Sequence, residues 1–408
     1  MSIRPYPSAT VSKKCEAFLD GGHVWVYDNE IKSCAPCEDG ALCDVFSEKG
    51  KYLGTGFYNS HSRIRVRILT KNANDRPDDG KFFARRVSYA VDYRRTVMPG
   101  SDFRCCRLIY GEADGLPGLT VDRYNDVLAA QCLCLGTELR REEIYTALVG
   151  KLRAEGEEIR ILYERSDGPT RGLEGMPPRT GFFEGVGLRA DSVGKTVICE
   201  NGIFYEVDYV GGQKTGFFLD QKYNRAALAR ISAGKTVLDC FTHTGSFALN
   251  AAKGGAKRVT AVDISNDALA LARENAARNG FENIDFVCAD VFDLLTDLYR
   301  AGNSPYDLIV LDPPAFTKSG ATVKNAFRGY KEINMKAMRL LPRGGYLATC
   351  SCSHFMTAPL FEKMLSEAAH DAGRTLLQIE QRRQAPDHPI LRGVPETEYL
   401  KFYLFQVT

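Results

Sequence analysis

The chain has 408 residues, and its 53 Lys and Arg residues against 51 Asp and Glu residues leave a formal net charge of +2. This length is too great for one ordinary domain, and the hydrophobic content of 44% is typical of a globular protein. A net charge so close to zero excludes a uniformly basic nucleic-acid binder, so any nucleic-acid surface must be a local patch.

Cysteine usage and the lack of targeting segments indicate the compartment. The N-terminus has no apolar signal segment, and no stretch approaches the ~20 apolar residues that span a bilayer. The 13 cysteines are scattered, often on apolar runs such as residues 287–289, which is typical of reduced, buried thiols. Cys34 and Cys37 form a lone CxxC motif without a second pair, so we expect no metal. We therefore expect a cytoplasmic protein with no membrane partner.

The first part of the chain, residues 1–72, reads as short strands and turns. Residues 23–27 and 64–68 alternate between apolar and polar side chains, the period of a half-buried strand. Three arginines lie on one face of the second strand, namely Arg63, Arg65 and Arg67. Such a row is suited to RNA phosphates, although a merely solvated face is the alternative.

A polar linker at residues 71–80 precedes a predicted helix over 81–96. Residues 73–207 then mix strand-like runs with a second helix at about 140–155, which predicts a central α+β domain. From 208 to 408 the pattern changes, because apolar strands alternate with longer helices. The strands expected there are 236–238, 259–262, 307–311 and 345–349. This βαβ series predicts a parallel sheet covered by helices, a Rossmann-like α/β domain.

Acidic residues follow these strands in succession. Asp239 and Asp263 end the first two and lie 24 positions apart, near the spacing of nucleoside-binding βαβ units. The turn between them, which includes Thr242, has one glycine, Gly245, to let the backbone approach a ligand. So little glycine disfavours a pyrophosphate but suits S-adenosylmethionine (SAM), whose sulfonium cation matches acidic strand ends.

Two further acids, Asp290 and Asp312, follow later strands. A carboxylate at Asp263 can accept both ribose hydroxyls, and Asp290 can take the adenine amino group. The alternative is that all four acids only cap helices and turns. Because ligands of open α/β folds bind at the carboxyl edge of the sheet, we expect a cofactor site for SAM there.

Residues 344–353 form a strand that carries two cysteines, Cys350 and Cys352. A thiolate bonded to C6 of a pyrimidine makes C5 nucleophilic enough to accept a methyl group. Both cysteines point the same way on a strand, so periodicity does not choose between them. We favour Cys352 because it is nearer the open edge, and the alternative is that both are small buried side chains.

The sequence Asp312-Pro313-Pro314-Ala315-Phe316 allows a second chemistry. Enzymes that methylate purine amino groups use a related loop, in which acceptors hold the exocyclic amine. Here the aromatic residue is displaced to Phe316, which fits that role less well. A Pro-rich turn that caps a strand is the structural alternative.

At this point the sequence resembles a known family, the bacterial 23S rRNA cytosine-5 methyltransferases with an N-terminal PUA domain. The resemblance is carried by residues 22–27 with Glu30 and Ile31, 115–124, 163–167, and 212–221 with Arg225. It implies a PUA RNA-binding domain at 1–72, a central domain at 73–207 and a SAM-dependent methyltransferase domain at 208–408. It also implies 23S ribosomal RNA as the partner and a homodimer as the assembly.

The resemblance further implies roles for individual residues. Those expected at the cofactor are Gln213, Thr215, Gly216, Phe218, Asp220, Arg225, Asp239, Thr242, Gly245, Asp263, Asp290 and Asp312. Asp312 would also face the target base, and Cys352 would be the nucleophile.

Two departures from the family pattern matter: Ser246 stands where a second glycine is usual, and Cys350 is an extra cysteine. We therefore expect a SAM-dependent enzyme that methylates C5 of a cytosine in 23S rRNA. The alternatives are methylation of a purine amino group and a non-catalytic ribosome assembly factor.

Overall fold

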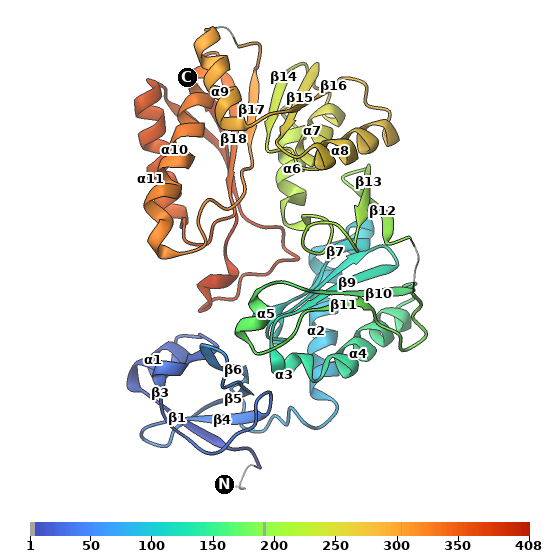
Figure 1. The fold of residues 1–408 in the computed structure, drawn as a ribbon, viewed down its shortest axis with the longest axis vertical. Helices are drawn as coiled ribbons and strands as arrows, with labels where there is room; N and C mark the ends of the chain where they lie inside the picture. Colours follow the sequence, from blue (N-terminus) through green and yellow to red (C-terminus); the bar gives the residue numbers. More distant parts are fainter. Residues whose placement is uncertain (1–4, 191–192, 303) are drawn as a thin grey trace. The chain divides into compact units, whose positions relative to one another are not determined.

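The computed structural model describes residues 5–190, 193–302 and 304–408. Contacts divide the chain into two compact units (Figure 1). The first unit comprises Met1–Ile198, Val207–Leu219 and Pro386–Thr397, and the second comprises Cys199–Glu206, Asp220–Ala385 and Glu398–Thr408. The two N-terminal domains expected from the sequence thus fall within one unit, and the expected boundaries at 72 and 207 stay a prediction.

A six-stranded sheet, in the order β2-β6-β5-β4-β1-β3, begins the first unit. Its strands are β1 (Ser8–Val11), β2 (Trp25–Tyr27), β3 (Ile31–Cys34), β4 (Leu42–Ser47), β5 (Tyr52–Tyr58) and β6 (Ile64–Thr70). Val26, Val66 and Ile68 are buried together with Cys15 of helix α1 (Lys13–Asp20). The alternating strands expected at 23–27 and 64–68 are therefore present, and their apolar faces form this core.

The first unit also contains a five-stranded sheet in the order β11-β10-β9-β8-β7. The strands are β7 (Cys105–Tyr110), β8 (Leu119–Tyr124), β9 (Val127–Cys132), β10 (Ile161–Ser166) and β11 (Arg179–Phe182). Helices α2 (Phe82–Val97) and α4 (Arg141–Ala154) contact each other, and α2 also contacts β7. Both helices begin and end within two residues of the bounds expected from the sequence.

The second unit contains a seven-stranded sheet in the order β16-β15-β14-β17-β18-β20-β19. Its strands are β14 (Thr236–Cys240), β15 (Arg258–Asp263), β16 (Ile284–Cys288), β17 (Leu308–Leu311), β18 (Gly345–Ser351), β19 (Leu376–Arg382) and β20 (Lys401–Val407). The five strands from β16 to β18 are parallel, whereas β20 runs antiparallel between β18 and β19. The βαβ series therefore forms the parallel sheet that the sequence predicts.

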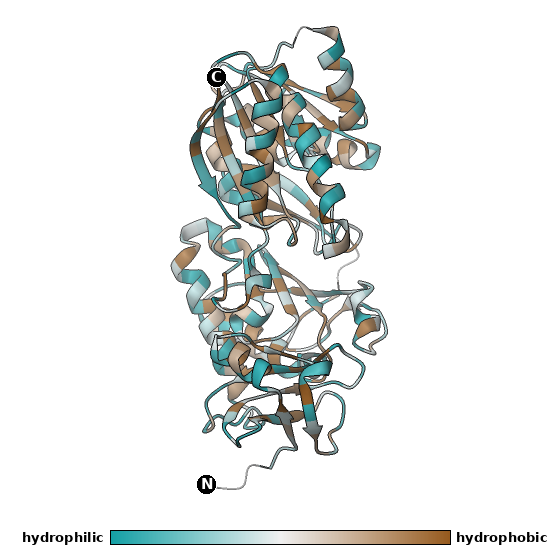
Figure 2. Cartoon of the chain, turned by 90° about the vertical axis from the view of Figure 1, so that its left-hand side faces the viewer, coloured by the Kyte–Doolittle hydropathy of each residue, from teal (hydrophilic) through white to brown (hydrophobic). Residues whose placement is uncertain are grey.

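Helices cover both faces of this sheet (Figure 1). They are α6 (Lys222–Ala229), α7 (Ser246–Lys253), α8 (Asn266–Arg278), α9 (Val291–Ala301), α10 (Val323–Leu340) and α11 (Ala358–Ala372). Neighbouring strand residues point to opposite faces, so Val237 packs in one core cluster and Leu238 in the other. The helices carry both hydrophobic and hydrophilic residues (Figure 2), as expected for helices with one face on a sheet and one in water. This is the Rossmann-like architecture expected from the sequence.

Candidate functional site

The carboxyl ends of the five parallel strands bring five predicted site residues of the second unit to one edge of its sheet. Across the sheet the order is Asp290 after β16, Asp263 at the end of β15, Asp239 in β14, Asp312 after β17 and Cys352 after β18. Residues 240 and 311 are paired in register, as are residues 311 and 349, so these ends lie level. Four carboxyl groups and a thiol therefore follow neighbouring strands at the edge where α/β folds bind ligands.

The loop between β14 and α7 has a strained backbone. Phe241, His243 and Gly245 have φ values of +63°, +51° and +83°. A Cβ at Gly245 would lie 2.8 Å from the side chain of Leu249, so packing and conformation both require glycine there. Sequence reasoning missed the two non-glycine residues with positive φ, because nothing in their side chains signals that conformation. Such strain is commonly found at functional sites.

Asp239 is buried beneath this loop, where its Oδ2 accepts hydrogen bonds from the Thr242 hydroxyl at 2.5 Å and the Ala248 amide at 2.8 Å. Its Oδ1 is also buried and has no hydrogen-bond partner among the residues that the structure describes. Burial, with a contribution from Asp312, raises the pKa of Asp239 to about 7. A buried carboxylate oxygen without a partner fits a cationic ligand, and SAM carries positive charge on its sulfonium and amino groups.

The next two acids along the edge bind the protein backbone. Asp263 accepts the amides of His243 and Ser265, each at 2.9 Å. Asp290 is the N-cap of α9, where its Oδ1 accepts the amides of Phe292 at 2.7 Å and Asp293 at 3.4 Å. Both carboxylates therefore cap backbone amides, as the alternative interpretation of the sequence expected. A carboxylate can accept about four hydrogen bonds, so each can still accept further ones from the ribose hydroxyls or the adenine amino group.

Asp312 has several polar neighbours within the second unit. Its Oδ1 accepts a hydrogen bond from Gln221 Nε2 at 3.0 Å, and the thiol of Cys350 is hydrogen-bonded to its carboxyl group. Burial and the nearby Asp220 carboxylate raise the pKa of Asp312 to about 7. Burial also raises the pKa of Cys350 well above its usual value. Cys350 is therefore a hydrogen-bonded, fully buried thiol.

Cys352 differs from Cys350 because β18 ends at Ser351, one residue before it. It is partly exposed, and its Sγ lies 3.9 Å from the carbonyl oxygen of Pro313. The residues on both sides of it, Ser351 and Ser353, hydrogen-bond to the hydroxyl of Tyr330 at 3.1 and 2.9 Å. Because Cys352 lies beyond the end of the strand, the rule that alternate strand residues point to the same face does not apply to it. The two cysteines have different surroundings.

Four residues of the predicted cofactor set lie in the first unit: Gln213, Thr215, Gly216 and Phe218. The Thr215 hydroxyl donates to Asp122 at 2.5 Å and accepts from the Tyr124 hydroxyl at 3.3 Å. Gly216 has φ +124°, and a Cβ there would lie 2.7 Å from Val207. Within the first unit, Thr215 of one stretch that carries the resemblance therefore contacts Asp122 and Tyr124 of another.

Two other predicted cofactor residues, Asp220 and Arg225, lie in the second unit and are buried. The Asp220 carboxylate accepts the Tyr399 hydroxyl at 2.5 Å. Arg225 forms a bidentate pair with the buried Glu200, with distances of 2.7 and 2.9 Å. This pair raises the pKa of Arg225 despite the opposing effect of burial. Arg225 is thus anchored by an ion pair that sequence reasoning did not foresee.

The three arginines expected on an RNA-binding face do not share one environment. Arg67 is only 9% exposed, and its guanidinium pairs with Glu112 at 2.8 Å and Glu174 at 3.0 Å. The prediction that Arg67 belongs to a row of surface arginines is therefore wrong, because Glu112 and Glu174 neutralise its charge and cover it. Arg63 is exposed and precedes β6, whereas Arg65 is half-buried and donates to the carbonyl of Asn59 at 3.0 Å.

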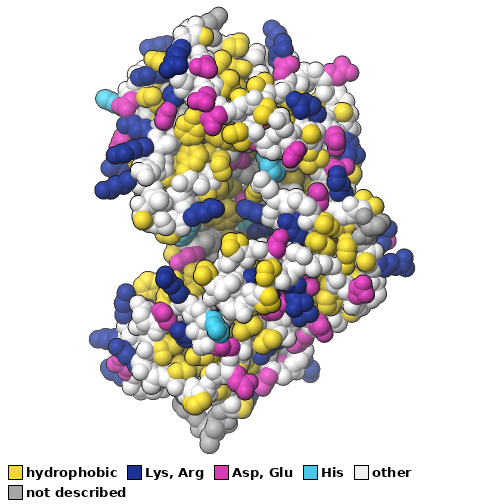
Figure 3. Space-filling view, in the orientation of Figure 1, with side chains coloured by type: hydrophobic (Ala, Val, Ile, Leu, Met, Phe, Trp, Pro, Cys, Tyr) yellow, Lys and Arg dark blue, Asp and Glu magenta, His cyan; other side chains and the backbone are white. Residues whose placement is uncertain are grey.

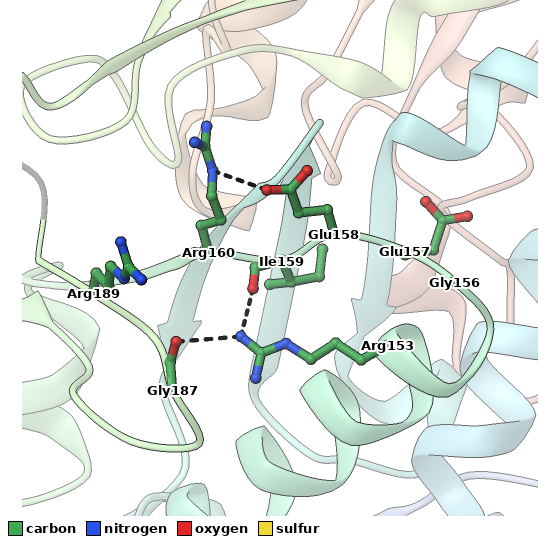
Figure 4. A pocket seen from close by; sticks show the side chains of 8 residues that line it. All are labelled: Arg153, Gly156, Glu157, Glu158, Ile159, Arg160, Gly187 and Arg189. Carbon is green, nitrogen blue, oxygen red and sulfur yellow. Dashed lines mark hydrogen bonds and ion pairs between the residues drawn. The ribbon is translucent and has the colours of Figure 1, made fainter.

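A hollow of about 600 Å³ lies elsewhere in the first unit (Figure 4). Arg153, Arg160 and Arg189 line it, but Arg153 donates to backbone carbonyls and Arg160 pairs with Glu158. None of the predicted site residues lines it. On the face shown in Figure 3, Lys and Arg side chains are interspersed with Asp and Glu, in agreement with the small net charge.

Metal-binding clusters and membrane-spanning helices are both lacking in the described part of the chain. Within residues 5–190, 193–302 and 304–408, no group of three or more His, Cys, Asp or Glu side chains is arranged to hold a metal ion. In the same residues no helix is long and apolar enough to cross a bilayer.

Solved structures share this fold over nearly its whole length. A Streptococcus mutans protein described as a SAM-dependent methyltransferase has a TM-score of 0.81 and 22% identity, and the match covers 98% of this chain and 99% of that one. A methyltransferase structure in complex with S-adenosylhomocysteine has a TM-score of 0.82 at the same identity and coverage. At this identity the likeness concerns the fold.

Two family models match the sequence directly. The model of S-adenosylmethionine-dependent methyltransferases covers residues 187–406, and that of PUA-like domains covers residues 9–71. The chain is therefore a SAM-dependent methyltransferase with an N-terminal PUA-like domain.

Curated relatives specify the family. Proteins named ribosomal RNA large subunit methyltransferase I are 41% identical in Alteromonas mediterranea, over 95% of both chains, and 43% identical in Shewanella denitrificans, over 95% of this chain and 96% of that one. The protein of that name in Klebsiella pneumoniae is 39% identical over 98% of both chains. The chain belongs to the family of ribosomal RNA large subunit methyltransferase I.

Proposed function

We propose that this chain transfers the methyl group of SAM to C5 of a cytosine in the 23S RNA of the large ribosomal subunit. The names of its relatives support large-subunit ribosomal RNA as the substrate. The observation that carries the cytosine-5 chemistry is the position of Cys352. It is the partly exposed thiol just beyond the carboxyl end of β18, near the loop that follows Asp312, whereas Cys350 is fully buried.

The chemistry requires a nucleophile because C5 of cytosine is too electron-poor to attack a methyl donor. In the proposed reaction the Cys352 thiolate bonds to C6, and the electrons of the C5–C6 double bond become available at C5. C5 then takes the methyl group, which leaves S-adenosylhomocysteine. Loss of the C5 proton restores the double bond and expels Cys352.

The cofactor site that we propose uses the acids at the edge of the sheet. Asp239 would lie beside the positively charged part of SAM, Asp263 would accept the ribose hydroxyls and Asp290 the adenine amino group. Asp312 would face the cytosine. Thr242 and Gly245 contribute by shaping the loop over Asp239.

The remaining assigned residues belong to the same proposal. Arg225 would serve the cofactor site, and its methionine end and lid would be formed by Gln213, Thr215, Gly216, Phe218 and Asp220. The contacts that Thr215 makes with Asp122, and Arg225 with Glu200, support a positioning role for these two residues.

The alternative chemistry, methylation of a purine amino group, requires the aromatic residue of the Asp-Pro-Pro loop to stack on the base. The ring of Phe316 instead packs against two other aromatic rings. Its centroid lies 4.5 Å from that of Tyr330 and 5.8 Å from that of Phe292. This packing favours the cytosine reaction. The non-catalytic alternative is disfavoured by Asp239, because a buried carboxylate oxygen without a partner costs stability unless a ligand uses it.

The RNA contact that we propose lies on the PUA-like domain, where Arg63 and Arg65 remain candidates for phosphate contacts and Arg67 does not. All 13 cysteines lie in the described residues as reduced thiols, which supports a cytoplasmic location. A homodimer is proposed from the family resemblance alone.

A methyl-transfer assay tests the reaction. Protein-free large-subunit RNA is incubated with labelled SAM and then digested to nucleosides for mass spectrometry. Label in 5-methylcytidine is expected for the wild type and for Cys350→Ala, and no label is expected for Cys352→Ala. Calorimetry with SAM should give similar affinities for the two variants. Label in a methylated purine, or full activity of Cys352→Ala, would refute the covalent cytosine mechanism.

A second assay tests the RNA surface. Arg63→Glu with Arg65→Glu should weaken RNA binding and reduce its dependence on salt concentration, because phosphate contacts release counterions. Binding that is unchanged would place the RNA contacts on another surface.

A further inference from the structure

Lys401 carries a buried amine whose nitrogen is hydrogen-bonded to Ser353, the residue after the proposed nucleophile. It is the first residue of β20, which runs antiparallel to β18, so it lies at the edge where the parallel strands end. Its Cα is paired in register with that of Ser351, one residue before Cys352. Its side chain is only 6% exposed.

The hydrogen bonds of Lys401 Nζ leave room for one further hydrogen-bond partner. Nζ donates to the carbonyl oxygens of Ser353 and Tyr399, each at 2.7 Å. An ammonium group has three N–H donors, so a third N–H remains, and in the neutral amine that position is a lone pair. Two neutral carbonyls do not balance a buried positive charge, which is unfavourable without an anion.

Cys352 and Glu398 both interact electrostatically with Lys401. Tyr330, from α10, also interacts electrostatically with Cys352, and its hydroxyl is hydrogen-bonded to Ser351 and Ser353. Burial raises the pKa of this phenol to about 12, so that it stays neutral. Burial lowers the pKa of Lys401 to about 8, while Cys352 and Glu398 raise it. An amine whose pKa is lowered by burial gives up its proton more readily and can take one back from a neighbouring thiol.

We propose that Lys401 is the positioning residue that holds Cys352 as a thiolate. This inference rests on the proposed function of Cys352. In the step that we infer, the S–H bond of Cys352 breaks and an N–H bond forms on the neutral Lys401 amine. A thiolate and an ammonium result, and the thiolate electron pair then forms the bond to C6 of the base. When Cys352 is expelled after methyl transfer, the same ammonium stabilises the departing thiolate.

The test measures the thiol without RNA. Each protein is alkylated with iodoacetamide at a series of pH values, and mass spectrometry follows the peptide that contains Cys352. In Lys401→Gln, where the amide can still donate to the two carbonyls, the midpoint of alkylation should rise by about 1–2 pH units. Alkylation at pH 7 should accordingly fall about 10–100-fold. Lys336→Gln, a change on α10 in the same unit, should not alter either value.

The methylation assay gives a second readout. The activity of Lys401→Gln should fall at pH 7 and recover as the pH is raised, whereas a purely structural defect would reduce activity equally at every pH. Lys401→Met provides a second uncharged variant, and SAM calorimetry checks that each variant is folded. An unchanged alkylation midpoint in both variants would overturn the role of Lys401. If instead Cys352→Ala retains methylation, the proposed function fails, although the effect of Lys401 on the thiol can still be measured.

Discussion

Replacing Asp239 with Asn should make the protein more stable at pH 8 and unable to bind SAM. The reason is the cost of holding a charged carboxylate in this position without its ligand. Asp239 is fully buried, one of its oxygens has no partner among the described residues, and its pKa is raised from 3.8 to about 7.

The sign of the effect follows from proton binding. The folded protein holds the proton of Asp239 up to about pH 7, while the unfolded chain releases it near pH 3.8. Because the unfolded state binds fewer protons between these values, rising pH lowers the free energy of unfolding across this range. A difference of about three pKa units corresponds to about 4 kcal/mol above pH 7.

Asn removes this charge but places an amide N–H where the unpartnered oxygen was, which costs about 1–3 kcal/mol. The net gain at pH 8 is therefore about 1–3 kcal/mol. The difference in the free energy of unfolding between Asp239→Asn and the wild type should grow by about 2–3 kcal/mol in favour of the variant between pH 5 and pH 8.

Urea unfolding measures this difference. The single tryptophan, Trp25, lies in the first unit, so its fluorescence serves as an internal control that the substitution should not change. Far-UV circular dichroism follows both units. SAM at 100 times its Kd should stabilise the wild type by about 2.7 kcal/mol and leave Asp239→Asn unaffected. A stability difference that is the same at pH 5 and pH 8, or normal SAM binding by the variant, would refute this reasoning.

Two further predictions concern packing in the second unit. Arg225→Met should lower the free energy of unfolding by about 3–5 kcal/mol because it leaves the buried Glu200 without its partner, and Glu200→Leu in the same chain should restore most of the loss in urea unfolding. Arg258→Ala, which removes an exposed ion pair, should leave stability unchanged, and an equal loss there would contradict the argument from burial. Gly245→Ala should destabilise the protein more than Gly280→Ala does, because both glycines have positive φ but only Gly245 has side-chain atoms within 3 Å of the added Cβ. Calorimetry should also show weaker SAM binding for Gly245→Ala alone, and equal effects of the two substitutions would exclude the packing contribution.

Much of the second unit was predictable from sequence because its elements have local signatures. The alternation of short apolar runs with longer helical stretches predicts parallel strands, and parallel strands necessarily end at one edge. The sequence alone therefore assigns Asp239, Asp263 and Asp312 to that edge. Helices such as α2 and α4 begin and end close to their expected bounds for the same reason.

Partners that are distant in the sequence were not predictable. Arg67 looked like one of three surface arginines, since periodicity places it on the same face as Arg65. The structure pairs it with Glu112 and Glu174, which are 45 and 107 residues away. An alternating pattern describes which face of a strand a residue occupies, but only the fold decides whether that face meets water or another element.

The sequence by itself determined the class of fold, the edge of the sheet that carries the acids and the two candidate cysteines. The sequence favoured Cys352 over Cys350, but only the tertiary structure gave the two thiols different surroundings. The strand ends between them, and one thiol is hydrogen-bonded to Asp312 while the other is partly exposed. The structure also brought Lys401 to the same edge, through the antiparallel strand β20 beside β18. Strand pairing joins residues about 50 positions apart, and hydrophobic periodicity within a single segment contains no information about such pairing.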